Sequence, residues 1–216
     1  MCDGVREPNH HSSKPLNDDS MATPAFRRVR RVIGHGAPAL FLRELWNQPG
    51  AVGAIWPSSD RLARRLAACV PKSGNGLIIE LGGGTGAVTK ALLEHGIAAE
   101  RLVVVERSPA FVRHLRRRFP AIHVLEGDAR QLADLLPDGQ PADAIVSGLP
   151  LRSLPAADAG AIVAQWPRVL RPGGRVIQFT YDLRGRPGPV LAGLTCRTSH
   201  LVWANLPPAR VFCLEP

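Results

Sequence analysis

Short hydrophobic runs alternate with amphipathic segments along most of the chain beyond residue 76. The runs that have the length and composition of buried strands are LIIEL (77–81), RLVVVE (101–106), IHVLEG (122–127), DAIVSGLP (143–150) and GRVIQFTY (174–181). Helical patterns fall near residues 85–96, 109–119, 129–136 and 157–170. Strands and helices that alternate at this spacing predict βαβ units around a parallel sheet.

The pattern changes after residue 195. The stretch CRTSHLVWANLPPARVFCLE (196–215) contains two strand-like runs joined by a Pro-Pro turn, so we expect a hairpin at one edge of the sheet. Together these elements predict an α/β, Rossmann-like fold whose seven-stranded, mostly parallel sheet ends in an antiparallel hairpin.

The first 70 residues differ in composition from the rest of the chain. Residues 1–20 are polar and rich in Pro, Ser, Asn and Asp, which predicts a disordered leader. Residues 21–70 have helical patterns that are broken around GHGAP (34–38) and NQPGAVGAIWPSS (47–59). We therefore divide the chain into the leader, an N-terminal helical extension (21–70) and one main domain (71–216).

An amphipathic pattern lies near the start of the helical extension. On a helix, the apolar side chains of residues 26–33 fall within an arc of about 120°, and four arginines occupy the opposite side. The apolar members are Phe26, Val29, Val32 and Ile33, and the basic members are Arg27, Arg28, Arg30 and Arg31. The pattern fits a helix that lies in a membrane interface, and it equally fits a helix packed on the core. The next piece, PALFLRELW (38–46), adds large apolar side chains that suit either membrane docking or a lid.

The composition narrows the possible partners. The net charge of +9 favours an anionic partner, either nucleic acid or an acidic membrane surface. No stretch reaches the roughly 18 apolar residues that a membrane-spanning helix needs, and the first 20 residues are too polar for a secretory signal. These features predict a cytoplasmic protein.

The cysteines and histidines show no metal-ligand spacing along the sequence. Cys2, Cys69, Cys196 and Cys213 form no C-x-x-C pair, and the seven histidines form no cluster of the H-x-x-x-H kind. The sequence therefore predicts free thiols in a reducing compartment and no metal site.

The strongest chemical signal is the stretch IIELGGGTGAVTKALLEHG (78–96). A buried strand ends at Glu80 and Leu81, three spaced glycines follow, and a helix begins near Ala87. Glycines at this place permit a sharp turn and the close approach of a ligand, and the helix start offers free N–H groups. The spacing also fits the dinucleotide fingerprint, with Glu106 placed to hold a ribose, so a nicotinamide-dependent oxidoreductase stays an alternative.

Three further features favour another ligand. Glu80 stands two residues before the first glycine, GDA (127–129) ends the third strand, and LRPGGRVI (170–177) supplies a Pro-Gly-Gly turn before the fifth strand. As a set, these motifs resemble the class I S-adenosylmethionine-dependent methyltransferases over residues 76 to 214. The resemblance implies S-adenosylmethionine as the cofactor and S-adenosylhomocysteine as the product.

The cofactor residues are carried over from this resemblance. They are Glu80, Gly82, Gly84, Thr85, Gly86, Glu106, Arg107, Asp128, Ala129 and Ser147. In the family the glycine turn lines the methionine part, the acidic residue that ends strand two binds the ribose, and the one after strand three binds the adenine. Ser58 or Ser59 is a candidate N-cap of the next helix, a candidate contact to the donor carboxylate, or both.

The segment after strand four bears on the methyl acceptor. Amino-group methylases of DNA and rRNA carry a polar-Pro-Pro-aromatic motif there, whereas this chain reads SGLPLRSLP (147–155). Gly148 replaces the polar residue and Leu151 replaces the aromatic residue, so no base-stacking platform is left. This counts against a nucleic-acid substrate and leaves rRNA adenine methylation as an alternative.

Four pieces together are similar to a narrower family. GAIWPSS (53–59), SGLPLRSLP, FTY (179–181) and NLPPARVF (205–212) resemble the soluble bacterial phospholipid N-methyltransferases. The resemblance implies stepwise methylation of phosphatidylethanolamine towards phosphatidylcholine, at the inner face of the cytoplasmic membrane and in contact with anionic lipids. It gives residues 26–33 a membrane-binding role. Asp182 stands where family members often have glycine, which leaves the range of head groups open.

The acceptor site implied by this resemblance contains Gly148, Leu149, Pro150 and Tyr181. Tyr181 is the candidate catalytic residue, because its ring or hydroxyl would bind the amine. The alternative for Tyr181 is a core aromatic residue with a tethered hydroxyl. His35 and His200 are candidate bases, although a histidine in such a position is more often a surface residue.

Overall fold

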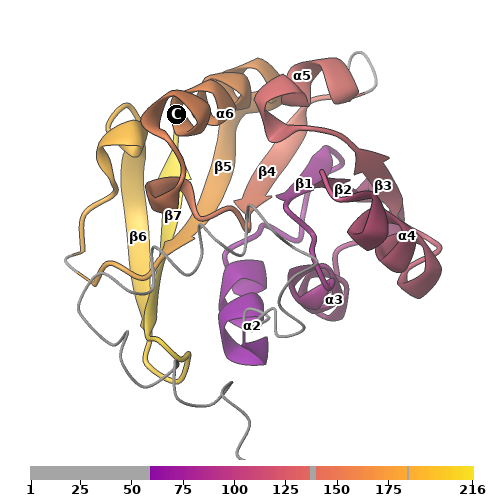
Figure 1. The fold of residues 1–216 in the computed structure, drawn as a ribbon, viewed down its shortest axis with the longest axis horizontal. Coiled ribbons are helices and arrows are strands. Elements are labelled where there is room, and N and C mark those ends of the chain that lie inside the picture. Colours follow the sequence, from indigo (N-terminus) through magenta and orange to yellow (C-terminus); the bar gives the residue numbers. More distant parts are fainter. Residues whose placement is uncertain (1–58, 137–139, 184) are drawn as a thin grey trace, which may run out of the picture. The chain divides into compact units, whose positions relative to one another are not determined.

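The computed structural model describes residues 59–136, 140–183 and 185–216 (Figure 1). All of them belong to one of the two compact units into which the chain divides, Gly36–Pro216. The predicted leader and the predicted extension up to residue 58 lie outside the described residues. So do residues 26–33, His35 and Ser58.

The sheet has the predicted composition. Its strands are β1 (Leu77–Leu81), β2 (Leu102–Glu106), β3 (His123–Glu126), β4 (Ala142–Ser147), β5 (Leu170–Thr180), β6 (Thr195–Val202) and β7 (Ala209–Glu215). They lie in the order β3-β2-β1-β4-β5-β7-β6. The first five are mutually parallel, and β7 runs antiparallel to both β5 and β6. The prediction of a seven-stranded, mostly parallel sheet that ends in an antiparallel hairpin is confirmed.

Helices cover both faces of the sheet (Figure 1). They are α2 (Asp60–Ala68), α3 (Ala87–Glu94), α4 (Pro109–Arg118), α5 (Leu132–Leu135) and α6 (Ala156–Val169), with short 3₁₀ turns η2 (Ala99–Arg101), η3 (Ala129–Gln131), η4 (Leu151–Ser153) and η5 (Pro189–Leu191). Side chains of α2, α3 and α4 form one core cluster with the sheet, and side chains of α5 and α6 form the other.

The two-sided cover explains the continuous hydrophobic runs. Every residue of β1, β2 and β4 is buried. Neighbouring residues such as Ile78 and Ile79 enter opposite core clusters, because side chains alternate across a strand. Strands buried on both faces are typical of parallel sheets.

The structure differs from the predicted elements in two places. The fifth strand begins at Leu170, so the Pro-Gly-Gly turn lies within β5, where the register with β4 shifts and Gly173 has a φ of +72°. The segment 129–136 is a 3₁₀ turn followed by a short helix rather than one helix. The Asp128 side chain accepts a hydrogen bond from Arg130 N (2.9 Å), which caps the 3₁₀ turn.

A buried carboxylate fastens the amino-terminal ends of the strands. Asp143 in β4 is almost fully buried and accepts hydrogen bonds from Gly76 N (3.1 Å) and from the guanidinium of Arg101 (2.7 Å). Arg171 in β5 pairs with its other oxygen. Three neighbouring strands are thus tied at the sheet edge opposite the glycine turn.

Candidate active site

The glycine turn after β1 is shaped by close packing. Gly82 and Gly86 have φ of +79° and +82°, and a Cβ at either place would lie 2.6 Å from Leu149 and 2.5 Å from Phe119, respectively. At Gly84, where φ is +50°, a Cβ would meet nothing within 4 Å. The turn is therefore crowded against the protein at its two ends and open at its middle, as a ligand cradle requires. Thr85 completes it, and its carbonyl accepts a hydrogen bond from Arg118 (2.8 Å).

Glu106 lies beside this turn at the end of β2. One carboxylate oxygen accepts a hydrogen bond from Gly84 N (2.9 Å), and the other accepts one from Ser108 N (2.8 Å). The residue is 9% exposed, so it is not a solvated strand end. Two backbone N–H groups fix the carboxylate next to the open middle of the turn.

Glu80 is fully buried at the end of β1. Its Oε2 accepts a hydrogen bond from Thr89 Oγ1 (2.7 Å), while its Oε1 is buried and has no partner among the described residues. Burial raises the pKa of this carboxyl to about 8. A buried acceptor without a donor is costly, and a cationic ligand group would supply the missing partner.

Asp128 follows β3 and lies near the end of β2, because Gly127 N donates a hydrogen bond to the Glu106 carbonyl (3.1 Å). Partial burial raises its pKa, but hydrogen bonds from Arg130 and the charges of Arg130 and Arg107 outweigh that effect and lower it. Arg130 also pairs with Asp158 in α6 (2.9 Å). The sequence analysis missed Arg130, whose side chain holds the Asp128 carboxylate at 2.7 Å.

The segment after β4 packs directly on the glycine turn. Gly148 N donates to the Leu81 carbonyl (2.8 Å), and the Ser147 hydroxyl accepts from Leu149 N (3.4 Å). Leu149 and Leu151 are 2% and 4% exposed and lie in the core cluster under α6. Pro150 joins them. The leucine that occupies the aromatic position of the nucleic-acid methylases is therefore a core residue.

Tyr181 directly follows β5, and its surroundings fit both sequence-based interpretations. Its ring packs edge-to-face on Phe179 with centroids 5.4 Å apart. Burial raises the pKa of its hydroxyl, which is hydrogen-bonded to the side chain of Asn205. The ring and hydroxyl are thus held in place at the carboxyl end of β5.

Asn205 is the functional candidate that the sequence analysis did not single out. It is buried in the β6–β7 loop and links this loop to the N-terminal end of α2. Ser59 donates to its Oδ1 through both the hydroxyl (2.6 Å) and the backbone N (3.2 Å), and Asn205 Nδ2 donates to the Pro207 carbonyl (2.6 Å). Its place at the start of the NLPP motif is the sequence signal that could have identified it. Ser59 is confirmed as the N-cap of α2, since its hydroxyl accepts from Leu62 N (3.3 Å).

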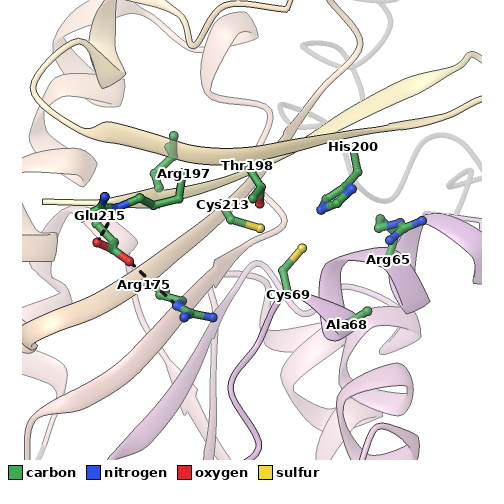
Figure 2. A pocket seen from close by; sticks show the side chains of 10 residues that line it. Arg65, Ala68, Cys69, Arg175, Arg197, Thr198, His200, Cys213 and Glu215 are labelled. Atoms are coloured by element: carbon green, nitrogen blue, oxygen red, sulfur yellow. Dashed lines mark hydrogen bonds and ion pairs between the residues drawn. The ribbon is translucent and has the colours of Figure 1, made fainter.

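Two other residues considered from sequence have different surroundings. Asp182 directly follows Tyr181 and pairs with Arg152 in η4 (2.8 Å). His200 lines a separate pocket with Cys69 and Cys213 (Figure 2). The described residues that converge at the carboxyl edge of the sheet are therefore Glu80, the glycine turn, Glu106, Asp128, Ser147 and Tyr181.

Comparison with known proteins agrees with this geometry. A family model described as "Methyltransferase domain" matches residues 78–174. The ornithine lipid N-methyltransferase of Singulisphaera acidiphila is 35% identical over 146 residues, which cover 65% of this chain and 76% of that protein. A probable ribosomal RNA small subunit methyltransferase A of Natronomonas pharaonis is 38% identical over 98 residues, or 42% of this chain and 33% of that protein.

A solved structure confirms the fold class. The N-methyltransferase NodS from Bradyrhizobium japonicum, in complex with S-adenosyl-L-homocysteine, matches with a TM-score of 0.61 at 16% identity. The match covers 80% of this chain and 97% of that chain.

The raised pKa of Glu80 predicts a pH-dependent cost to stability. Between pH 4.5 and 8 the unfolded chain releases the proton that the folded chain retains, so folding becomes less favourable as pH rises through this window. Relative to the wild type, Glu80→Gln should gain about 1.4 kcal/mol of unfolding free energy per pH unit there. Urea denaturation of the ligand-free chain at several pH values measures this difference. The control is Glu94→Gln, which removes an exposed carboxylate of α3. If the unfolding free energies of Glu80→Gln and the wild type depended on pH in the same way, the burial argument would be contradicted.

Proposed function

We propose that this chain, which belongs to the class I S-adenosylmethionine-dependent methyltransferases, methylates the amino nitrogen of a membrane lipid. The observation that carries the proposal is the 35% identity with an ornithine lipid N-methyltransferase along three quarters of that protein. S-adenosylmethionine is the cofactor of the family.

Two lipid head groups are candidates. The motifs GAIWPSS, SGLPLRSLP, FTY and NLPPARVF favour phosphatidylethanolamine, methylated stepwise towards phosphatidylcholine. The curated relative favours the amine of an ornithine lipid. Both lipids carry an amine at the membrane surface, so the same chemistry serves either one.

The geometry after β4 argues against a nucleobase substrate. A base that is stacked for methylation needs an exposed aromatic ring, and Leu151 at that place is buried in the core. The similarity to the ribosomal RNA methyltransferase covers only a third of that protein. Because the chain belongs to the methyltransferase family, we do not propose the alternative function of a nicotinamide-dependent oxidoreductase.

The described residues fit S-adenosylmethionine. The unpartnered oxygen of Glu80 suits the amino group of the cofactor's amino-acid part. The open middle of the turn at Gly84 lets the cofactor approach the backbone closely. A carboxylate has about four acceptor sites, so Glu106 can bind ribose hydroxyls while it keeps both backbone N–H groups. We assign the adenine to Asp128, Ala129 and Arg107, which directly follow β3 and β2.

Bound S-adenosylmethionine supplies an electrophilic methyl group, so the protein mainly has to position a neutral amine in line with it. Tyr181 carries this task in our proposal. Its hydroxyl is held by Asn205 and its ring by Phe179, which fixes both groups before a substrate arrives. Gly148, Leu149 and Pro150, which follow β4, are the other residues that we assign to the acceptor site.

A labelling experiment tests the proposed substrate. The full chain is incubated with methyl-labelled donor and vesicles that contain phosphatidylethanolamine, ornithine lipid or only phosphatidylcholine, and a fourth reaction contains ribosomal RNA. We expect label in mono- and dimethylated lipid from one or both amine-bearing vesicles. Label in RNA alone, or none in either amine lipid, would overturn the proposal.

Glu106 is expected to dominate donor affinity. Glu106→Ala removes two hydrogen bonds to a charged group, each worth about 1.5–3 kcal/mol, so donor affinity should fall at least about tenfold while the fold survives. Glu106→Gln keeps the side-chain size and should show a smaller loss. Calorimetric titration measures both variants, and the control is Glu126→Gln, which changes the exposed last residue of β3, opposite Glu106. Unchanged affinity in Glu106→Ala would remove Glu106 from the site.

Substitutions at Tyr181 separate its two interpretations. If the ring binds the amine, Tyr181→Ala should lower turnover on lipid by about tenfold or more and leave donor affinity nearly intact. Tyr181→Phe keeps the ring and isolates the contribution of the hydroxyl. Parallel loss of donor binding and thermal stability in Tyr181→Ala would instead identify a core packing residue.

We further propose that the chain reaches its substrate as a peripheral membrane protein, with residues 26–33 and the β6–β7 loop in contact with lipid. In the described part of the chain no helix has the length and apolar character to cross a bilayer. Trp203 and Leu206 are 70% and 71% exposed and flank Asn205. Large apolar side chains exposed beside a site are typical of interface contacts.

Vesicle sedimentation tests this proposal. Each arginine near an anionic leaflet contributes on the order of 1 kcal/mol, so reversing Arg27, Arg28, Arg30 and Arg31 to glutamate should abolish binding to anionic vesicles. Binding of the wild type should weaken with salt, and Trp203→Ser with Leu206→Ser should weaken it independently of salt. Equal sedimentation of the charge-reversed variant and the wild type would contradict the role of the arginines.

A further inference from the structure

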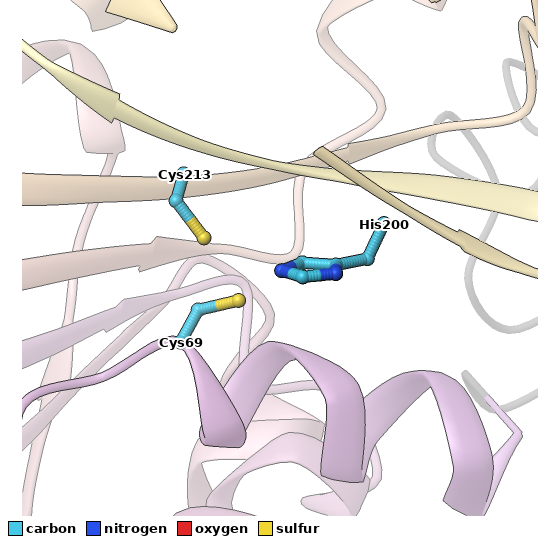
Figure 3. A group of neighbouring side chains, drawn as sticks. All are labelled: Cys69, His200 and Cys213. Atoms are coloured by element: carbon cyan, nitrogen blue, oxygen red, sulfur yellow. The ribbon is translucent and has the colours of Figure 1, made fainter. Parts of the chain in front are cut away.

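The structure assigns a binding site for a zinc-class metal ion to Cys69, His200 and Cys213 (Figure 3). The Sγ atoms of both cysteines and one ring nitrogen of the histidine all lie within 4.8 Å of one another. The inference does not depend on the proposed lipid substrate. It departs from the absence of metal that sequence spacing predicted, since that spacing ignores contacts between distant segments.

Three separate elements bring the ligand atoms together. Cys69 is the C-cap of α2, His200 lies in β6 and Cys213 in β7. Cys213 is opposite Thr198 and His200 is opposite Val211 in the antiparallel ladder. His200 and Cys213 are therefore diagonal neighbours on one face of the hairpin, and Cys69 meets them from the end of the helix. Figure 3 shows the three side chains pointing toward one another.

The donor set suits a borderline-soft cation. Two thiolates and one imidazole are ligands that Zn²⁺ takes in tetrahedral sites, often with a fourth position left for water or another ligand. Zn–S bonds of about 2.3 Å place tetrahedral ligand atoms roughly 3.8 Å apart, so the widest separation needs to shorten by about 1 Å. Side-chain rotation supplies a change of this size.

The surroundings provide room and electrostatic balance. A cavity of about 360 Å³ adjoins the cluster and leaves space for a fourth ligand (Figure 2). Arg65 and Arg175 line it, and Arg175 also pairs with Glu215 at 4.0 Å. A divalent ion with two thiolates and a neutral imidazole has no net charge, so the nearby guanidinium groups do not oppose the complex.

Both cysteines bind a metal ion as thiolates, so an ion at this site would displace their protons. It would also fasten the C-terminal end of α2 to the hairpin, as the hydrogen bonds of Ser59 with Asn205 fasten its N-terminal end.

Metal titration tests the site. Because Cys2, His10 and His11 are further donors in the sequence, all measurements use the tag-free full chain with Cys2→Ser, His10→Ala and His11→Ala. The protein is reduced, stripped with chelator and titrated with Zn²⁺ against a chromophoric chelator. Co²⁺ then reports thiolate ligation through its charge-transfer absorption and tetrahedral geometry through its visible bands.

We expect one ion per chain and a rise in melting temperature on addition of Zn²⁺. Cys69→Ser and His200→Ala, both partly exposed, should each lower metal affinity at least about tenfold and abolish the thermal shift. Cys196→Ser is the matched control, because it removes an exposed thiol of β6 that lies outside the cluster. It should bind Zn²⁺ with the same affinity as the parent chain that carries Cys2→Ser, His10→Ala and His11→Ala. Circular dichroism checks that each variant is folded.

Two results would overturn the inference. One is Zn²⁺ affinity in Cys69→Ser and His200→Ala equal to that of the background chain. The other is a reduced chain that binds no ion but joins Cys69 to Cys213 as a disulfide in air, as peptide mass mapping would show. That second result would identify the pair as a redox-active dithiol.

Discussion

The backbone turns that follow β1 and β4 touch each other, and the whole carboxyl edge of the sheet is arranged around this contact. Gly148 N donates to the Leu81 carbonyl (2.8 Å), and Leu149 fills the space that a Cβ at Gly82 would need. Strand order reverses between these two strands, which is where ligands enter open α/β sheets. The contact keeps side chains out of the turn and leaves its middle, at Gly84, open to a ligand.

Charge is distributed unequally between the two ends of the strands. At the amino ends, the Asp143 carboxylate is matched by the guanidinium groups of Arg101 and Arg171. At the carboxyl ends, the Glu80 carboxylate accepts a hydrogen bond from a hydroxyl and the Glu106 carboxylate accepts hydrogen bonds from backbone N–H groups. Two acidic groups with remaining acceptor capacity suit a cofactor that carries an ammonium group, a sulfonium group and ribose hydroxyls.

The sequence predicted most of what is local and little of what joins distant segments. β1, β2 and β4 were recognisable because strands buried on both faces read as unbroken apolar runs, and the glycine turn was recognisable by its spacing. Asn205 was missed because its partner Ser59 lies 146 positions away. The strand-like course of residues 170–174 was hidden by Pro-Gly-Gly, which reads as a turn. The cluster of Cys69, His200 and Cys213 has no sequence signature because three elements build it.

The ion pairs of Asp143 with Arg101 and Arg171 hold the amino-terminal ends of the strands together, and this affects how such a protein can change its specificity during evolution. The partners of Asp143 belong to the strands and to the turns between them, while the ion pair of Arg152 and Asp182 lies at the opposite rim, next to Tyr181 and the acceptor site that we propose. Selection can therefore exchange rim residues, and with them the molecule that is methylated, without disturbing the interactions that hold the strands in register. New specificity can arise in such a lineage by drift at the rim before any compensating change in the scaffold is required.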